Sequence, residues 1–279
     1  MSVSLLSLSL ALTLGQDLGF GSPWILAGFG LAAVTGVAFV IVELRVESPM
    51  IQLRLFRSPM LTVSVTSGFL AFVCLSATFF LLPFYLEGVL GFEVGAVGLL
   101  LGVAPLLMGV ISPLAGNLSD RFGIRRIALF GIALIALSYW GFYTFDVDTT
   151  VPRYLLIAVP LGVGLGAFNS PNNSAIMGSV PPEYIGLGGG LLTITRLLGQ
   201  ISGIAILGSL WAAAVASASG GTLPAAGAAA ADQAAQVAGL HVTFGVAAVI
   251  MTASLAISAW GMHRERVDAR SGSVAGAQA

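Results

Sequence analysis

Eight apolar segments, separated by short polar or glycine- and proline-rich breaks, constrain this chain more than any other feature. Most of them reach the roughly 20 residues that a helix needs to cross the ~30 Å hydrocarbon core of a bilayer. The strands of membrane barrels are only about 10 residues long and alternate in polarity, and these segments do not alternate. The sequence therefore predicts an all-α membrane protein. The segments are residues 3–15, 24–42, 60–86, 94–114, 127–145, 154–180, 185–215 and 240–262.

Composition supports the same class. Only 8% of the 279 residues are charged and 57% are hydrophobic, whereas a soluble domain has about a quarter of its residues charged. Much of the surface must therefore face a lipid bilayer, and no nucleic-acid partner is predicted. The single cysteine, Cys74, excludes an internal disulfide and lies in an apolar run, where we expect a small buried hydrophobe. No catalytic, zinc or phosphate-binding motif is present, so we predict neither enzyme activity nor a cofactor.

The arginines predict the orientation in the membrane. If the spans alternate in direction, nine of the ten arginines in loops fall on one side and Arg153 alone falls on the other. The positive-inside rule then places the arginine-rich loops and the C-terminus in the cytoplasm of a multi-pass plasma or inner membrane protein. The nine are Arg45, Arg54, Arg57, Arg121, Arg125, Arg126, Arg264, Arg266 and Arg270.

The segments between and around the spans suggest the domain boundaries. Residues 1–44 are predicted to form a hairpin of two helices whose first helix is clipped, which indicates a fragment. Residues 45–59 are predicted to be a cytoplasmic connection with a short surface helix near 51–56. Residues 225–238 have high helix propensity, so we expect a short helix there. The small polar tail, 264–279, is predicted to be disordered.

The connection between the fourth and fifth spans is the most specific local feature. It joins them through about ten residues and is predicted to be a tight loop. Gly116 and Gly123 permit close helix approach and a left-handed turn. Asp120 is suited to accept hydrogen bonds at a helix start or to pair with an arginine, and Arg125 and Arg126 to anchor against anionic headgroups. The alternative is an ordinary positively charged loop.

This stretch resembles the loop signature of the major facilitator superfamily, Gly-x-Leu-x-Asp-Arg-x-Gly-x-Arg-Arg. Residues 49–57, 82–91 and 195–203 resemble the family's fourteen-helix drug:proton antiporter branch, although Glu87 stands where glutamine is usual. The resemblance implies two linker helices followed by one six-helix bundle in residues 60–263, built from two inverted three-helix repeats. The matching signature residues are Gly116, Leu118, Asp120, Arg121, Gly123, Arg125 and Arg126.

The resemblance also implies a function. The chain would be the C-terminal portion of a secondary transporter that exports drugs or small amphiphiles by alternating access, coupled to protons, with a missing N-terminal six-helix bundle as its partner and a small molecule as its substrate. Every Asp and Glu of residues 60–262 falls in a loop or at a span end, so this part is not expected to carry the proton. The alternatives are a half-size protein that assembles with a separate N-terminal half or with itself, and a membrane scaffold or sensor.

Polar residues inside the spans are the candidates for a substrate cavity. Arg196 at mid-helix costs about 2.5–3.5 kcal/mol on insertion scales, so it must face protein or water. It either contacts substrate or stabilises one conformational state, or it is a structural arginine that snorkels to the surface. Thr193 and Gln200 fall close to its helix face.

The run 169–174 in the sixth span is also polar. Pro171 is predicted to kink this helix, and Asn169 and Asn172 are then candidates to line the cavity. Alternatively, the asparagines cap the cytoplasmic end of the helix.

Glycines and aromatic residues have simpler interpretations. The spacings of Gly199 and Gly203, and of Gly162, Gly164 and Gly166, predict close helix packing in lipid. Five aromatic side chains are suited to form an apolar wall of the cavity, but each fits a lipid-facing position as well. They are Phe72, Phe79, Phe80, Tyr85 and Phe168.

Overall fold

The computed structural model describes residues 58–220, Ala228, residues 231–276 and a few helical positions before residue 39. The predictions for the first two spans, for the connection 45–59 and for the surface helix near 51–56 fall outside or almost entirely outside these residues. The described part is helical, with no strand. Its elements are α3 (Pro59–Phe84), the π-helical turn η2 (Tyr85–Val89), α4 (Val94–Phe122), α5 (Ile124–Phe142), α6 (Val151–Gly178), the 3-10 turn η3 (Pro182–Tyr184), α7 (Ile185–Ala218) and α8 (Gln233–Gly276).

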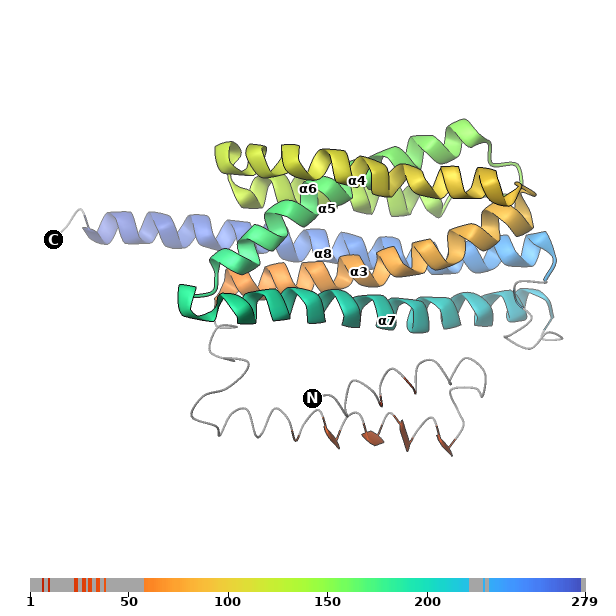
Figure 1. The fold of residues 1–279 in the computed structure, drawn as a ribbon, viewed down its shortest axis with the longest axis horizontal. Coiled ribbons are helices and arrows are strands. Elements are labelled where there is room, and N and C mark those ends of the chain that lie inside the picture. Colours follow the sequence, from red (N-terminus) through yellow and green to blue (C-terminus); the bar gives the residue numbers. More distant parts are fainter. Residues whose placement is uncertain are drawn as a thin grey trace.

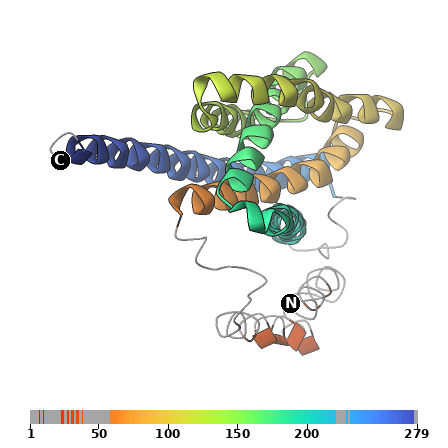
Figure 2. The same ribbon diagram turned by 60° about the vertical axis from the view of Figure 1, so that its left-hand side comes forward.

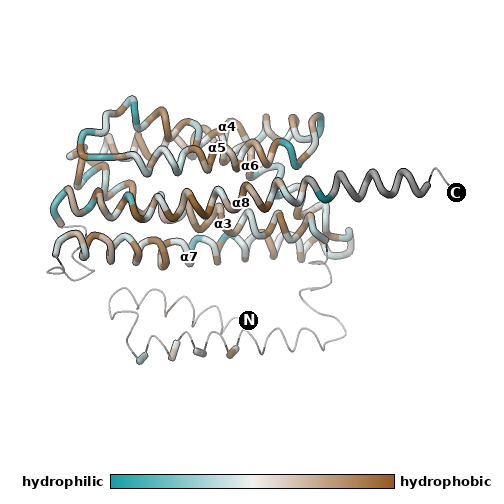
Figure 3. The backbone as a smooth tube through the Cα atoms, turned by 180° about the vertical axis from the view of Figure 1, so that it is seen from behind, coloured by the Kyte–Doolittle hydropathy of each residue, from teal (hydrophilic) through white to brown (hydrophobic). Residues whose placement is uncertain are grey.

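Six helices among the described residues are long and apolar enough to cross a membrane. They are α3 with η2, α4, α5, α6, α7 and the part of α8 from Gln233 to Met262, which confirms the six spans predicted after residue 59. They lie side by side and alternate in direction (Figure 1). Apolar residues dominate their length, and hydrophilic residues gather toward the ends of the bundle (Figure 3).

We call the end of the bundle that holds the α4–α5 junction the signature end, and the other the opposite end. Because the helices alternate, α3, α5 and α7 begin at the signature end, and α4, α6 and α8 run toward it (Figure 1). Arg121, Arg125, Arg126 and Arg264 therefore belong to the signature end. Arg153, in the first turn of α6, belongs to the opposite end.

The packing pairs the helices in two equivalent ways. The first helix of the first repeat, α3, lies along α7, and the first helix of the second repeat, α6, lies along α4 (Figure 1). The third helices of the repeats, α5 and α8, pack on one another. Exchange of the two three-helix units maps these pairs onto each other. This is the relation expected of inverted repeats in a major-facilitator bundle.

Glycines set the approach of α3 to α7. A Cβ atom on Gly199 would lie 2.7 Å from Cβ of Phe72 and 2.9 Å from the carbonyl oxygen of Phe69. A Cβ atom on Gly203 would overlap the backbone of Val73. The spacing of Gly199 and Gly203 thus brings the two backbones together, as predicted.

Alternate glycines place α6 between two neighbours. Cβ atoms on Gly162 and Gly166 would lie 2.8 Å from atoms of Ala104 and Ile111 in α4. A Cβ atom on Gly164 would lie 2.9 Å from the carbonyl oxygen of Gly131 in α5. Residues two apart on a helix point to nearly opposite sides, so this run lets α6 pack closely on both α4 and α5.

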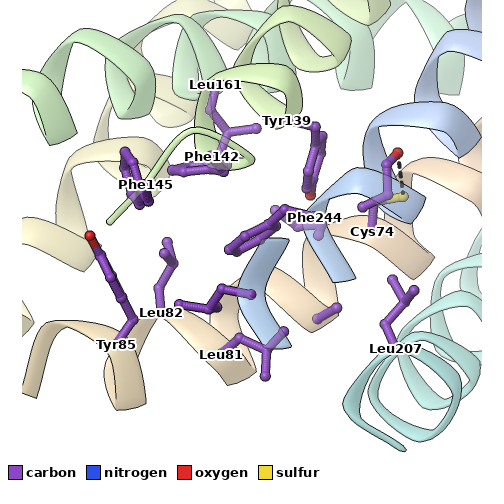
Figure 4. Packing of buried hydrophobic residues seen from close by; sticks show 14 of the residues in the cluster. Cys74, Leu81, Leu82, Tyr85, Tyr139, Phe142, Phe145, Leu161, Leu207 and Phe244 are labelled. Carbon is purple, nitrogen blue, oxygen red and sulfur yellow. Dashed lines mark hydrogen bonds between the residues drawn. The ribbon is translucent and has the colours of Figure 1, made fainter. Parts of the chain in front are cut away.

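Aromatic side chains fill the core toward the opposite end. The rings of Phe142 and Phe244 stack with centroids 5.2 Å apart (Figure 4). The hydroxyls of Tyr139 and Thr78 lie 2.8 Å apart. Cys74 is fully buried beside them, and its thiol lies 3.7 Å from the carbonyl oxygen of Ala247. The prediction of a buried cysteine is therefore confirmed.

Two predictions about α8 were wrong. The helix continues to Gly276 and projects beyond the bundle at the signature end (Figure 2), so residues 264–276 are helical rather than disordered. A helix that is already formed extends without a new nucleation cost, and Arg, Glu and Ala extend it well. Most of residues 225–230 lies outside the described part, and the predicted short helix is contradicted further on, because residues 231 and 232 are not helical and residues 233–238 form the first turns of α8.

Candidate functional site

The signature sequence forms a helix–helix corner with a single residue between the helices. α4 runs on to Phe122 and α5 begins at Ile124, so the predicted loop of about ten residues is absent. Gly123 has φ 93° and ψ 134°, its N–H donates to the Ser119 carbonyl at 2.9 Å, and its own carbonyl accepts from the Arg126 N–H at 3.2 Å. Only glycine adopts such a conformation without strain. The left-handed turn predicted at Gly123 is therefore present.

Gly116 has the packing role that the sequence suggests. It lies in α4, and a Cβ atom there would lie 3.2 Å from Oγ of Ser170 in α6. The position thus brings the signature end of α4 against the polar run of α6.

Several signature residues face outward. Leu118, Asp120, Arg121 and Arg126 are all exposed. The start of α5 has no side-chain cap. The prediction that Asp120 accepts hydrogen bonds at this helix start was therefore wrong.

Arg125 points into the bundle instead of toward the surface. Its terminal nitrogens Nη1 and Nη2 are shielded from solvent. They lie over Gly261 of α8, where a Cβ atom would stand 2.8 Å from Nη1 and 3.0 Å from a methyl carbon of Val63. The expectation that Arg125 anchors to headgroups beside Arg126 was therefore wrong. The absence of a side chain at Gly261 makes room for the guanidinium.

A small polar cavity lies beside this guanidinium. It has a volume of about 30 Å³, and about 10–15 Å³ is enough to hold one water molecule. Ser67 of α3 and Ser258 of α8 line it and share a hydrogen bond of 2.8 Å. The other polar side chains on its walls are Ser64, Arg125 and Asn172, and the rest of the lining is apolar.

The two candidate asparagines of α6 face different neighbours. Asn172 is buried and lines the internal cavity, with Nδ2 3.1 Å from where a Cβ of Gly68 would be. Asn169 is half-buried and turns toward α4, where Nδ2 lies 3.7 Å from the sulfur of Met108. The helix continues through Pro171 to Gly178, so the alternative that these asparagines cap its end is wrong.

Arg196 lies on the exposed side of α7. It stands eleven residues from Ile185, which is about 16 Å along the axis at about 1.5 Å per residue. Its guanidinium carbon lies 5.2 Å from the ring centroid of Phe72, a cation–π contact with α3. The Arg196 guanidinium therefore contacts an aromatic ring on one side, while the residue remains exposed on the outer surface of α7.

Thr193 and Gln200, the predicted neighbours of Arg196 on α7, differ in exposure. Thr193 is exposed, and its hydroxyl donates to the Gly189 carbonyl at 3.0 Å. Gln200 is half-buried. Arg196, Thr193 and Gln200 therefore form an outer group on α7, separate from the inner group of Asn172 and Arg125.

The predicted aromatic wall divides in the same way. Tyr85 and Phe168 are almost fully buried in the bundle core, so they form no surface. Phe79 is 41% exposed, and Phe72 and Phe80 are half-buried along α3. Only these last three can meet a ligand or another helix from outside.

The exposed face of α4 has a distinctive composition. Only 11% of its most apolar stretch is buried, the lowest share among the six described spans. Gly95, Gly98, Gly102 and Gly109 follow one another along this face, and a Cβ atom at any of them would meet nothing within 4 Å. In membranes such rows of small residues let helices approach closely.

Sequence reasoning missed the serines of the inner cavity. Ser64 and Ser67 are one turn apart in an apolar helix, and Ser258 comes from a helix almost two hundred residues further on. The spacing of the first two was visible in the sequence, but their convergence with Ser258 was not. No group of His, Cys, Asp and Glu within the described part of the chain could hold a metal ion.

The described residues form six spans in two three-helix units that pack on each other, with a glycine corner between α4 and α5 of the first unit. This arrangement defines a polytopic membrane protein of the transporter type. The sequence pattern of the Major Facilitator Superfamily matches residues 1–204, and the chain belongs to this family of multi-pass membrane transporters.

Several curated relatives were found. The chain is 36% identical to the riboflavin transporter RibZ of Clostridioides difficile over 61% of its length. It is 32% identical to the tetracenomycin C resistance and export protein of Streptomyces glaucescens over 67%, and 26% identical to the lincomycin resistance protein LmrB of Bacillus subtilis over 70%. These matches span only 37%, 35% and 41% of the three relatives.

Proposed function

We propose that this chain forms the C-terminal six-helix bundle, with its preceding linker helices, of a fourteen-helix transporter that exports drugs or small amphiphiles. In this proposal an N-terminal six-helix bundle packs on the exposed faces of α4 and α7. The two bundles rock about a substrate site between them and open it alternately to each side of the membrane. The arginine-rich signature end faces the cytoplasm, in accordance with the positive-inside rule.

The observation that carries the proposal is the exposed position of Arg196. A guanidinium this deep in a span costs about 2.5–3.5 kcal/mol on insertion scales if lipid surrounds it, so its side of α7 must border water or protein. The exposed glycine row of α4 supports the same conclusion. Glycine in a helix that merely faces lipid costs helix stability, about 1 kcal/mol relative to alanine, and gains no packing.

The substrate class rests on the relatives. Two of the three named above are a drug export protein and a drug resistance protein, which favours efflux of amphiphilic drugs. The riboflavin transporter favours a second candidate, a planar heteroaromatic vitamin. Partly exposed Phe72 and Phe79, beside a cation, suit either substrate.

Proton coupling is assigned to the other bundle. Every Asp and Glu of the described spans and their connections lies in a connection or near a helix end, as Glu87, Asp120 and Asp146 illustrate. None stands at mid-membrane, where proton-carrying acids of transporters are found.

The test is a transport assay with the chain in its complete reading frame, expressed in cells that lack their own drug exporters. We expect active extrusion of an amphiphilic dye, abolished by a protonophore. Arg196→Ala should lower the extrusion rate about tenfold or more, equivalent to roughly 1.4 kcal/mol. Arg264→Ala is the matched control, because Arg264 also covers an aromatic ring, Trp260 at 4.3 Å, but lies at the end of its span.

Unchanged transport by both Arg196→Ala and Arg196→Lys, at normal membrane abundance, would show that Arg196 is structural. Riboflavin movement without movement of any drug or dye would favour the vitamin transporter. Failure to move any of these compounds would favour a scaffold or sensor.

A further inference from the structure

An apolar groove lies along α8 near the opposite end, beside Tyr143, the residue that follows α5. Its volume is about 410 Å³, within the roughly 300–1,000 Å³ of ligand sites. Four of the lining residues follow one face of α8 at helical spacing. The lining consists of Tyr143, His241, Val242, Gly245, Val246, Val249 and Ile250.

The shape of the groove depends on Gly245. The ring of Tyr143 lies against it, and a Cβ atom there would be 3.2 Å from a ring carbon. Val242, Val246 and Val249 remain 45%, 38% and 58% exposed. The groove is therefore an open apolar channel in a membrane-spanning surface, which begins near the end of the span and runs toward its middle.

Two polar side chains bind the connection that directly follows Tyr143, at the end of this groove. Arg153 Nη2 donates to the Thr144 carbonyl at 2.6 Å. His241 Nε2 lies 2.6 Å from the Phe145 carbonyl and, because a carbonyl only accepts, donates to it. Since these carbonyls belong to consecutive residues, the two side chains stand on the same turn.

The charges around this turn are of both signs. Arg153 is exposed and carries the positive charge, while Asp146 and Asp148 are exposed in the same connection. Two hydrogen bonds stabilise this connection. The Asp148 N–H donates to Asp146 Oδ1 at 2.8 Å, and the Tyr85 hydroxyl donates to the Asp146 carbonyl at 2.6 Å. A headgroup with one negative and one positive group complements it better than a purely anionic one.

We propose that this groove binds a zwitterionic glycerophospholipid. One acyl chain lies along Val242, Val246 and Val249 of α8. The phosphate meets Arg153 at the mouth, and the headgroup ammonium lies toward Asp146 and Asp148. An acyl chain fits because the groove is apolar along its length and polar only where the span ends. None of these residues belongs to the proposed substrate site.

The experiment uses the protein expressed from its complete reading frame, purified and placed in nanodiscs. Phosphatidylethanolamine with a photoreactive group on one acyl chain is added in trace amounts and irradiated, and the labelled peptides are identified by mass spectrometry. We expect labelling concentrated within residues 242–250, competed by unlabelled phosphatidylethanolamine more strongly than by phosphatidylglycerol.

Two variants test the two ends of the site. Val246→Phe fills the groove from its open side and should abolish this labelling, whereas Leu156→Phe, at a 75% exposed position on α6, should leave it unchanged. Arg153→Gln retains a donor for the Thr144 carbonyl but removes the charge. It should weaken competition by phosphatidylethanolamine about tenfold, as expected for one charge-assisted hydrogen bond.

The proposal is wrong if labelling of residues 242–250 matches that of other exposed apolar surface and does not respond to Val246→Phe. It is also wrong if the groove is shielded by residues 1–57, which crosslinking between the two segments would reveal. Equal competition by both lipids would reject the zwitterionic headgroup.

Discussion

The guanidinium of Arg125 lies directly over Gly261 of α8, where a Cβ atom would stand 2.8 Å from Nη1. Arg125, the first of the two adjacent arginines that end the signature, thus reaches the last span. Through this contact the α4–α5 corner is linked to α8 and to the polar cavity lined by Ser67 and Ser258. A movement of the corner would therefore be transmitted to the third helices of both repeats.

The first prediction concerns this link. Gly261→Leu should expel the guanidinium of Arg125 from its place and lower transport about as much as Arg125→Gln does, because both remove the charge from the cavity. The double variant should then be no worse than either single variant, since coupled changes are not additive. Gly178→Leu is the control, as a Cβ atom there meets nothing within 4 Å. Additive losses would show that Gly261 and Arg125 act separately.

The second prediction concerns the corner itself. Gly123→Ala should destabilise the bundle by about 1–3 kcal/mol, because φ 93° with ψ 134° is strained for any residue with a Cβ atom. Gly95→Ala, at an open helical position, should be neutral or slightly stabilising. Thermal unfolding of the purified protein in detergent measures both, and equal midpoints for the two variants would contradict the geometry of the corner.

The third prediction concerns the hydrogen bond between Ser67 and Ser258. A double-mutant cycle with Ser67→Ala and Ser258→Ala should give a coupling energy of about 0.6 kcal/mol, and no more than roughly 1.7 kcal/mol, as for other hydrogen bonds between membrane helices. Reversible unfolding in mixed micelles supplies the four free energies. A coupling energy of zero would indicate that each hydroxyl interacts mainly with water in the cavity.

The fourth prediction concerns the exposed row of α4. Gly102 is exposed, and a Cβ atom there would meet nothing within 4 Å. Gly102→Leu would therefore separate this face from a second bundle packed on it. Transport should therefore fall about tenfold, equivalent to roughly 1.4 kcal/mol, with normal thermal stability. Ala256→Leu, on the exposed face of α8, should have no effect. Normal transport by Gly102→Leu would place the second bundle elsewhere.

The sequence by itself determined the class of protein, the six spans after residue 59 and the glycine contacts between them. These features follow from local composition, because span length and helix periodicity do not depend on distant residues. The left-handed turn at Gly123 was likewise visible in the signature.

Only the tertiary structure decided which way each polar side chain faces. Arg125 and Asn172 turn inward because Gly261 and Gly68, far away in the sequence, leave space for them. Arg196 turns outward onto Phe72 of another helix. A helical sequence fixes the angles between its own side chains, but the side that is buried depends on the neighbouring helices, and these meet only when the whole bundle has packed.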